Sequence, residues 1–423
     1  MESTIEIIND KRSADSSIEL VKIDFQSKSS DKIIRTRKKL IRITTIPLSL
    51  KVLLKQQLKF MSAHYDVLAV ASPEKMLDEV AASEGVRTAA VLMTRTISPV
   101  KDIKALWQLY RLFKKEQPSI IHTHTPKAGL LGMIAAKMAG VSIRMHTVAG
   151  LPLMETKGIK KRMLEWVERL TYTCATKVYP NSKNLAEYIL QNKYCASKKL
   201  KVLGNGSSNG IDTDFFQLNP NILFAANNLR ERLQVKKDDF VFVFIGRLVK
   251  DKGMEELVDA FSRLKKTHRN SKLLLVGHYE PELDPLSNDT VQLIQEDNDI
   301  MQVGFQADIR PYLAISDVLT FPSYREGFPN VPMQAACMNI PSIVTDINGC
   351  NEIIEDGKNG LIIPPKNSEA LYQAMEALIT NRSLYDALKA NARRLIVEKY
   401  DQNHFWNLLL KEYEEQLANE SLS

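Results

Sequence analysis

The stretch "FVFVFIGRLVKDKGMEELVDAF" (residues 240–261) decides how the second half of this chain folds. Its first six residues are all apolar and rich in valine and phenylalanine, which predicts a buried strand. A loop with two glycines follows, and from Met254 the apolar residues recur at helical spacing. A strand, a short loop and a helix in this order begin a βαβ unit, so the stretch predicts a parallel sheet.

The same order repeats on both sides of this stretch. Downstream, the strand-like segments are "KLLLVG", "IMQVGF", "DVLTFPS", "PSIVTD" and "GLIIPP". Upstream, they are "LIRITTIP" from Leu40, "YDVLAVAS", "SIIHTHT", "SIRMHTV" and "KVYPNS", with helices expected at "LKVLLKQQLKFMSAH" and "KAGLLGMIAAKMAG". We therefore expect an α/β protein with two Rossmann-like parallel-sheet domains that face a central cleft.

The segment "GNGSSNGIDTDFFQLNPN" (204–221) is dense in turn-forming residues and marks the boundary between the two domains. Residues 1–37 show no clear period, and we treat them as an extension of uncertain order. The expected domains are then residues 38–210 and 211–395. Residues 396–423 are expected to form a C-terminal helix that packs back on the first domain.

The bulk composition is that of an ordinary globular protein of about two domains, with 423 residues, 44% hydrophobic and 25% charged. The apolar runs are too short to cross a bilayer, and the N-terminal residues do not resemble a signal peptide. Four widely spaced cysteines favour free thiols in a reducing cytoplasm. The net charge of +7 comes without a nucleic-acid-binding motif, so nucleic acid is not expected as a partner.

Two cations, Arg247 and Lys252, follow the strand of the opening stretch, next to Gly246 and Gly253. Cations beside a helix N-terminus suit a diphosphate, because charge and free backbone N–H groups act together. The loop is neither a Walker A loop nor a GxGxxG turn. From this motif alone, ordinary surface cations remain an equal alternative.

A second strand–loop–helix unit contains "REGFPNVPMQAAC" (325–337). Glu326 belongs to the loop and Gln334 to the first turns of the helix, so both can face the same strand ends. A carboxylate and an amide placed in this way could hold sugar hydroxyls. The alternative is that Glu326 is solvated and Asn330 caps the helix.

Three histidines lie near the ends of two successive strands, at His122, His124 and His146. Together with Gly150 they suggest a site that faces the cleft, where histidine can donate a hydrogen bond or act near neutral pH as acid or base. No cysteine or carboxylate completes a zinc site. The Asp-x-Asp sequence at 212–214 lies in the interdomain loop, where turn chemistry is expected, so no metal is predicted.

A helix is expected over 159–173, with Ile159, Met163, Trp166, Val167 and Leu170 on one apolar face. Packing on its own domain is the simpler interpretation of this face. The basic runs at 157–162 and 32–42 could instead hold the first domain against anionic lipid.

Taken together, these segments resemble the family 4 glycosyltransferases with the GT-B fold, over roughly residues 38–418. "GRLVKDKGMEELVDAF" is similar to the diphosphate loop of that family, and the stretch from "FPSYREGFPN" to "GLIIPP" (321–365) is similar to its donor-binding signature. "NGIDTDFF" resembles its interdomain hinge. The first half, "IIHTHTPKAGLLGMIAAKMAG" and "RMHTVAGLPL", is similar to members that assemble bacterial capsule and O-antigen units.

The resemblance implies that the first domain binds the acceptor and the second binds a nucleotide sugar. His146 would lie beside the reacting sugar and Glu326 beside the donor sugar and phosphates, as the catalytic residues. Gln334 stands where the family has an acid for the ribose, and "TTIPLSLK" (44–51) replaces the usual glycine-rich loop. We place at the donor diphosphate Gly246, Arg247, Lys252, Gly327, Phe328, Pro329 and Asn330, and on the acceptor side Thr45, His124 and Lys127.

The resemblance further implies a retaining glycosyltransferase that needs no cofactor. A UDP-sugar is the favoured donor and a glycan on undecaprenyl diphosphate the expected acceptor, with the enzyme cytoplasmic and peripheral to the inner face of the membrane. Two alternatives stay open. One is an inactive nucleotide-sugar-binding subunit of a polysaccharide assembly complex, which the Gln334 substitution favours, and the other is a nucleotide-sugar epimerase on the same two-domain plan.

Overall fold

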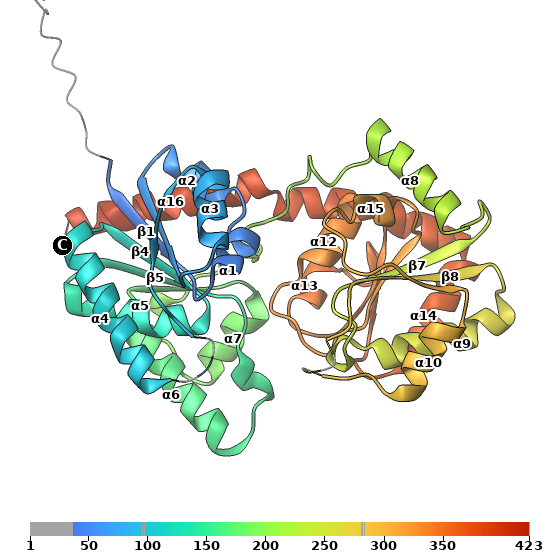
Figure 1. Ribbon diagram of the computed structural model, residues 1–423, viewed down its shortest axis with the longest axis horizontal. Helices are drawn as coiled ribbons and strands as arrows, with labels where there is room; N and C mark the ends of the chain where they lie inside the picture. Colours follow the sequence, from blue (N-terminus) through green and yellow to red (C-terminus); the bar gives the residue numbers. More distant parts are fainter. Residues whose placement is uncertain (1–36, 95, 97, 281, 283, 423) are drawn as a thin grey trace, which may run out of the picture. The chain divides into compact units, whose positions relative to one another are not determined.

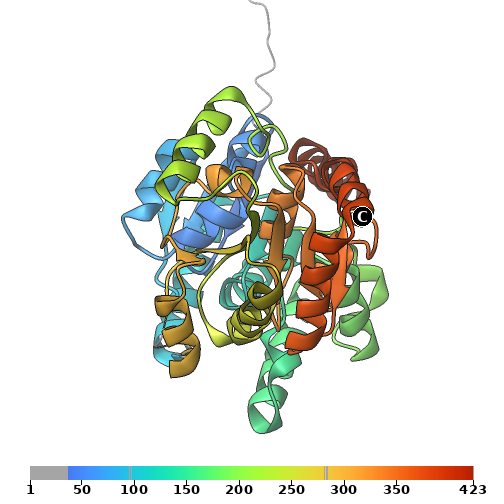
Figure 2. The same cartoon turned by 90° about the vertical axis from the view of Figure 1, so that its right-hand side faces the viewer.

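The computed structural model describes residues 37–94, 96, 98–280, 282 and 284–422. The extension expected at residues 1–37 lies outside these residues, apart from Arg37. The unit Arg37–Ser423 contains two six-stranded sheets, which Figures 1 and 2 show with helices around each. The predicted α/β architecture is confirmed.

The first sheet has the strand order β3-β2-β1-β4-β5-β6, and all its neighbouring strands are parallel. Its strands are β1 (Lys39–Ile43), β2 (Asp66–Ala71), β3 (Arg87–Ala90), β4 (Ile120–His124), β5 (Ile143–Val148) and β6 (Lys177–Pro180). The segments around it are α1 (Pro47–Leu53), α2 (Gln57–Ser62), α3 (Met76–Glu84), α4 (Pro99–Glu116), α5 (Pro126–Ala139), η1 (Pro152–Glu155), α6 (Gly158–Cys174), α7 (Lys183–Gln191) and η2 (Ser197–Lys199). We call this part the first domain.

The second sheet, with the order β12-β11-β10-β7-β8-β9, is also parallel throughout. Its strands are β7 (Phe240–Ile245), β8 (Ser271–Val276), β9 (Ile300–Gln302), β10 (Val318–Phe321), β11 (Ser342–Thr345) and β12 (Gly360–Ile363). Its helical segments are α8 (Pro220–Arg232), η3 (Lys250–Lys252), α9 (Met254–Thr267), α10 (Asn288–Glu296), α11 (Arg310–Ala314), α12 (Asn330–Cys337), α13 (Cys350–Ile353), α14 (Ser368–Thr380) and α15 (Arg382–Tyr400). Counted from its own first strand, this second domain has the same strand order as the first.

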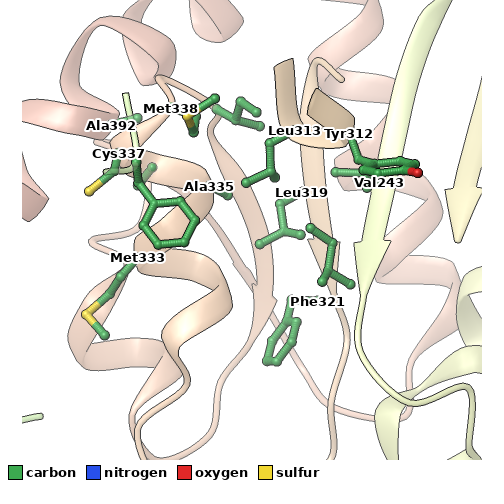
Figure 3. Close-up of a cluster of buried hydrophobic side chains, with 14 of the residues drawn as sticks. Val243, Tyr312, Leu313, Leu319, Phe321, Met333, Ala335, Cys337, Met338 and Ala392 are labelled. Atoms are coloured by element: carbon green, nitrogen blue, oxygen red, sulfur yellow. The ribbon is translucent and has the colours of Figure 1, made fainter. Parts of the chain in front are cut away.

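The apolar strand of the opening stretch is buried on both faces. Val243 belongs to one core cluster and Phe242 to another, because successive side chains of a strand point to opposite faces. Figure 3 shows part of the first of these clusters, to which α12 contributes Met333 and Ala335 and β10 contributes Leu319 and Phe321. Helices on both faces explain why the strand contains no polar residue.

The C-terminal segment forms a separate helix, α16 (Gln402–Ser421), which packs on the first sheet. Its buried side chains share a core cluster with residues of β1, β2, β4 and β5; they are Phe405, Trp406, Leu409, Tyr413 and Leu417. The hydroxyl of Tyr413 lies 2.6 Å from Nδ1 of His122 on β4. In the structure, therefore, the last helix of the chain completes the core of the first domain.

The interdomain segment crosses beside the start of α16. Ile211 forms a parallel bridge with Asp401, and the Thr213 hydroxyl donates to the Asp401 carboxylate at 2.9 Å. Asp212 accepts from the backbone N–H of Phe215 at 2.8 Å, which is the turn chemistry expected for this Asp-x-Asp sequence.

Two helix predictions need correction. The helix expected at "LKVLLKQQLKFMSAH" is broken, because Gln56 has a φ of 63° and Gln57 turns inward to accept from the buried guanidinium of Arg42. In α6, only the later part of the predicted apolar face packs on its own domain, where Leu170 contacts the core; Ile159 is 87% exposed and Trp166 63% exposed.

Candidate active site

A cavity of about 420 Å³ lies where the carboxyl ends of the two sheets' strands face each other. Its first-domain wall comes from the residues after β4, from β5 and the residues after it, and from α6. Its second-domain wall comes from the loops after β7 and β10. The lining residues are Thr125, Pro126, His146, Thr147, Val148, Ala149, Gly150, Leu151, Glu168, Arg247, Asp251, Lys252, Arg325, Glu326 and Gly327.

The second-domain wall holds the paired charges of Lys252 and Glu326. Their Nζ–Oε1 distance is 2.5 Å, and each side chain is only about one-sixth exposed, at 15% and 16%. The Ser323 hydroxyl also donates to Glu326, at 3.0 Å. Glu326 is therefore held from two sides, which corrects the alternative of a solvated acid.

Arg247 lines the same cavity but is more open, with its side chain 40% exposed and an ion pair to Glu280 at 3.0 Å. It lies at the end of β7, while Lys252 ends the short η3 helix that leads into α9. β7 and β10 are adjacent in the sheet, so the two loops that follow them meet at one edge. This adjacency brings Arg247, Lys252 and Glu326 together at one cavity wall.

Glycine is required where Gly327 meets the first domain. A Cβ at Gly327 would lie 2.0 Å from the carbonyl oxygen of Ala149, too close for any other residue. Gly150 approaches from the other side, since its own Cβ would lie 3.5 Å from the Gly327 Cα. The glycine of the "REGFPN" loop thus allows the two walls to touch beside the cavity.

His146 is the one predicted histidine on the cavity wall of the described chain. Its Nδ1 lies 2.8 Å from the Thr123 hydroxyl, which orients the ring. Burial lowers the pKa of His146 to about 4, so the imidazole is neutral at pH 7. The ring rests on α5 over Gly129, where a Cβ would lie 2.4 Å from His146 Cε1.

Glu168 of α6 is a cavity residue that the sequence analysis missed. The side chain is buried, and burial raises its pKa to about 7, partly offset by the Tyr172 hydroxyl one helical turn away. The buried side of α6 contains Leu164, Glu168, Thr171 and Tyr172 at helical spacing. This spacing could have indicated that Glu168 is on the buried side of the helix. The stripe of Ile159, Met163 and Trp166 is more apolar, however, and therefore predicts the opposite orientation.

Several residues assigned to the donor site do not line the cavity. Gly246 continues the pairing of β7 with β8, because its N–H donates to the carbonyl oxygen of Val276. Phe328 packs into the core, and its ring centroid lies 5.5 Å from that of Tyr400. Pro329 precedes α12, and Asn330 is its first residue and not a side-chain cap. Gln334 is half-buried on α12 and is likewise absent from the cavity wall.

The three acceptor-side residues are also engaged elsewhere. His124 lies 3.1 Å from Nε of Arg42 in a buried cluster under α16, Thr45 bonds to Thr125, and Lys127 forms an ion pair with Asp102 at 2.5 Å. Burial lowers the pKa of both His122 and His124 well below the usual range. The expectation that all three histidines face the cleft is wrong.

Residues 32–36 of the basic run at 32–42 lie outside the described chain. Arg37 and Lys38 are exposed, Lys39 pairs with Glu116 at 3.2 Å, and Arg42 is completely buried in β1. Over the same described residues, no group of three or more histidine, cysteine, aspartate or glutamate side chains is placed to hold a metal ion. No helix among them is long and apolar enough to span a bilayer.

Two Rossmann-like domains of equal topology, with cations on one wall of the shared cavity and a histidine on the other, define the GT-B class of glycosyltransferases. Family comparison agrees: residues 226–395 match the model for glycosyl transferases group 1, and residues 56–206 match the glycosyl transferase 4-like domain.

Individual relatives extend this match over most of the chain. The capsular polysaccharide biosynthesis glycosyltransferase CapM of Staphylococcus aureus is 32% identical over 377 residues, which cover 89% of this chain and 96% of the relative. The UDP-Gal:alpha-D-GlcNAc-diphosphoundecaprenol alpha-1,3-galactosyltransferase of Escherichia coli is 30% identical over 317 residues, or 73% and 78% of the two chains. The crystal structure of Anabaena Alr3699/HepE has the same fold, with a TM-score of 0.74, 18% identity, and coverage of 89% of this chain and 100% of that one.

This chain belongs to the group 1 glycosyltransferases, and it is a sugar-transferring enzyme with the GT-B fold.

Proposed function

We propose that this glycosyltransferase moves a sugar from a UDP-sugar to a glycan on undecaprenyl diphosphate, with retention of anomeric configuration, in the assembly of capsule or O-antigen. The cavity carries this proposal, because it places Arg247, Lys252 and Glu326 opposite His146. The name of the Escherichia coli relative specifies both a UDP-sugar donor and a diphosphoundecaprenol acceptor, and that of the Staphylococcus aureus relative specifies capsular polysaccharide.

The second-domain wall suits the donor diphosphate. Arg247 and Lys252 supply two positive charges, and α9 begins at Met254, directly after this loop. Cations and a helix N-terminus stabilise the negative charge that develops on a departing diphosphate, and such groups act strongly in a water-poor cleft. We infer that this charge replaces a metal ion, so that the reaction needs none.

The first-domain wall suits the reacting sugar and the acceptor. His146 is neutral at pH 7 and fixed by Thr123, so its free ring nitrogen can hydrogen-bond to a sugar hydroxyl without adding charge. Holding donor and acceptor in one cavity provides the alignment that a transfer reaction requires.

Two helices of the first domain support binding at a membrane surface. In α4, Val100 is 83%, Ile103 68% and Trp107 54% exposed; in α6, the exposed residues are Ile159, Met163 and Trp166. Both helices pack against α5. We call these six residues the α4–α6 apolar surface.

Both helices that carry the α4–α6 apolar surface have a net positive charge. Helix α4 carries five lysines and arginines against two acids, and α6 carries four against two. Exposed tryptophans with basic neighbours match the interface of an anionic membrane, where the rings enter the headgroup region and the cations contact lipid phosphates. This location would bring the enzyme to a lipid-linked acceptor.

The experiment that tests the function is incubation of the purified protein with a panel of UDP-sugars and polyprenyl diphosphate-linked saccharides. Mass spectrometry would detect a lipid-linked product heavier by one sugar, and proton NMR of that product would give its anomeric configuration. Donor binding without transfer to any acceptor would instead identify a binding subunit, and conversion of the donor to its epimer without acceptor would identify an epimerase.

A further inference from the structure

Glu168 differs from the other acids of the cavity. Three acidic residues of the described chain line this space, and two of them form ion pairs: Glu326 with Lys252, and Asp251 with Arg325. Glu168 forms no ion pair with any described residue, although it is only 6% exposed. A buried acid without a cation costs folding free energy, so its presence at a cavity wall calls for a functional reason.

The position of Glu168 places it on the acceptor side. It lies on α6 of the first domain, and the same wall carries His146, Thr125 and Gly150. The cations that suit a diphosphate lie on the opposite wall. The Tyr172 ring, four residues from Glu168 on the same helix, has its centroid 6.1 Å from that of His146, so acid, phenol and imidazole are neighbours.

The charged groups around Glu168 come from several elements. Tyr172 is on its own helix, and His146 is on β5 in the same cavity wall. Across the cavity are Arg247, Asp251, Lys252, Arg325 and Glu326. Burial is the largest influence on Glu168 and raises its pKa to about 7, so near neutral pH the carboxyl can both take up and release a proton.

We propose that Glu168 binds the reacting hydroxyl of the acceptor and accepts its proton during transfer. This inference rests on the proposed function and names the group that the first domain contributes to it. A glycosyl acceptor reacts through a hydroxyl whose proton must leave, and a carboxylate within hydrogen-bond reach is a suitable base.

For a single step that retains configuration, the acceptor oxygen forms a bond to the anomeric carbon on the same face that the diphosphate leaves, and the bond between that carbon and the diphosphate oxygen breaks. The electron pair of the broken bond leaves with the diphosphate, opposite Arg247 and Lys252. The hydroxyl proton passes to Glu168, which later releases it to solvent through the open side of the cavity.

The test compares Glu168→Gln with the matched control Glu165→Gln. Glu165 lies one turn earlier on α6, where its carboxylate accepts from the Tyr194 hydroxyl at 3.0 Å, and it does not line the cavity. We expect Glu168→Gln to lower kcat by about 100-fold or more, with the affinity for UDP unchanged. The wild-type rate should rise with pH through about 7 and the Gln variant should lack this rise, because only the deprotonated carboxylate accepts a proton.

Glu168→Asp keeps the carboxyl on a shorter side chain, so it should be slower than wild type but keep the rise with pH. Equal kcat values and equal pH profiles for wild type and Glu168→Gln would overturn the assignment while leaving the proposed function intact. A purely structural role would lower the melting temperature and leave the pH profile unchanged, which also overturns it. Absence of transfer by the wild type with every donor and acceptor would overturn the proposed function, and the assignment with it.

Discussion

Nζ of Lys252, at the end of η3, lies 2.5 Å from Oε1 of Glu326, on the loop after β10. The two residues are 74 positions apart in sequence and meet because β7 and β10 are neighbours in the second sheet. The pair fixes a cation at the cavity wall, where the side chain would otherwise move freely. We therefore expect the Lys252 ammonium group to be in position to bind the donor diphosphate before the donor arrives.

Lys252→Ala should weaken UDP binding by about 10- to 100-fold, because a charged hydrogen bond to phosphate is lost. Lys250→Ala is the matched control: Lys250 lies on the same short helix, but its side chain is half exposed and pairs with Glu255 away from the cavity lining. Isothermal titration calorimetry with UDP measures both. Equal affinities for the two variants would remove Lys252 from the donor site.

Gly129→Ala should slow turnover by about tenfold or more, since the added methyl would displace the His146 ring and small misalignments reduce rates strongly. His146→Ala should have the same kinetic effect without adding atoms to α5. The affinity for UDP should change little in either variant, because the cations lie on the other wall. Lys137→Ala, on the exposed side of α5, serves as the control. A normal kcat for both Gly129→Ala and His146→Ala would exclude His146 from the reaction.

The donor loops could be predicted from the sequence because each is a local strand–loop–helix unit with glycine and charge in the loop. The sequence could not show in the same way which of the three histidines lines the cavity. Thr123 pairs in register with His146, so His146 shares a sheet face with Thr123 and α5, while His122 and His124 point to the opposite face. That opposite face is covered by α16, a helix almost 300 residues later, whose Tyr413 is 291 positions from His122.

Glu168 shows a second limit of sequence reasoning. Helical periodicity predicts α6, but hydrophobicity alone favours burial of Ile159, Met163 and Trp166 over burial of Glu168. In the structure the acid faces inward and the apolar stripe faces solvent. Only the packing of α6 on α5 distinguishes these two arrangements.

Glu168→Gln should stabilise the protein at alkaline pH and have little effect in acid. The folded pKa of about 7 exceeds the ordinary value of 4.5, so between these values the folded state binds more protons and wild-type stability falls as pH rises. The full shift corresponds to about 3 kcal/mol. Urea unfolding of both proteins at several pH values from 4 to 8 measures it, and parallel stability curves would contradict a raised Glu168 pKa.

Transfer activity should survive EDTA, because Arg247 and Lys252 are proposed to take the place of a metal opposite the leaving diphosphate. The measurement is the initial rate after dialysis against EDTA, with and without added Mg²⁺ or Mn²⁺. Loss of activity that either ion restores would show that the two cations are insufficient. In that case Asp251, which lines the cavity beside Lys252, would be the first residue to substitute.

The α4–α6 apolar surface should bind anionic vesicles. Replacement of both Trp107 and Trp166 by serine should weaken binding at least tenfold, because burying one such aromatic side chain contributes about 1.5–3 kcal/mol. Phe224→Ser is the matched control: it removes an aromatic ring that is 69% exposed on α8 of the second domain. Flotation with phosphatidylglycerol vesicles measures all three proteins, and equal binding by wild type and the double variant would exclude this surface.

The basic residues beside this surface should affect vesicle binding in a different way from the tryptophans. Replacing Lys160, Lys161 and Arg162 by alanine should remove the preference for phosphatidylglycerol over phosphatidylcholine, since each cation near an anionic surface contributes about 1 kcal/mol. The tryptophan variant should keep that preference at its lower affinity, because its cations are intact. Binding that is insensitive to lipid charge in the wild type would mean that the basic residues serve another purpose, and salt would then have no effect on flotation.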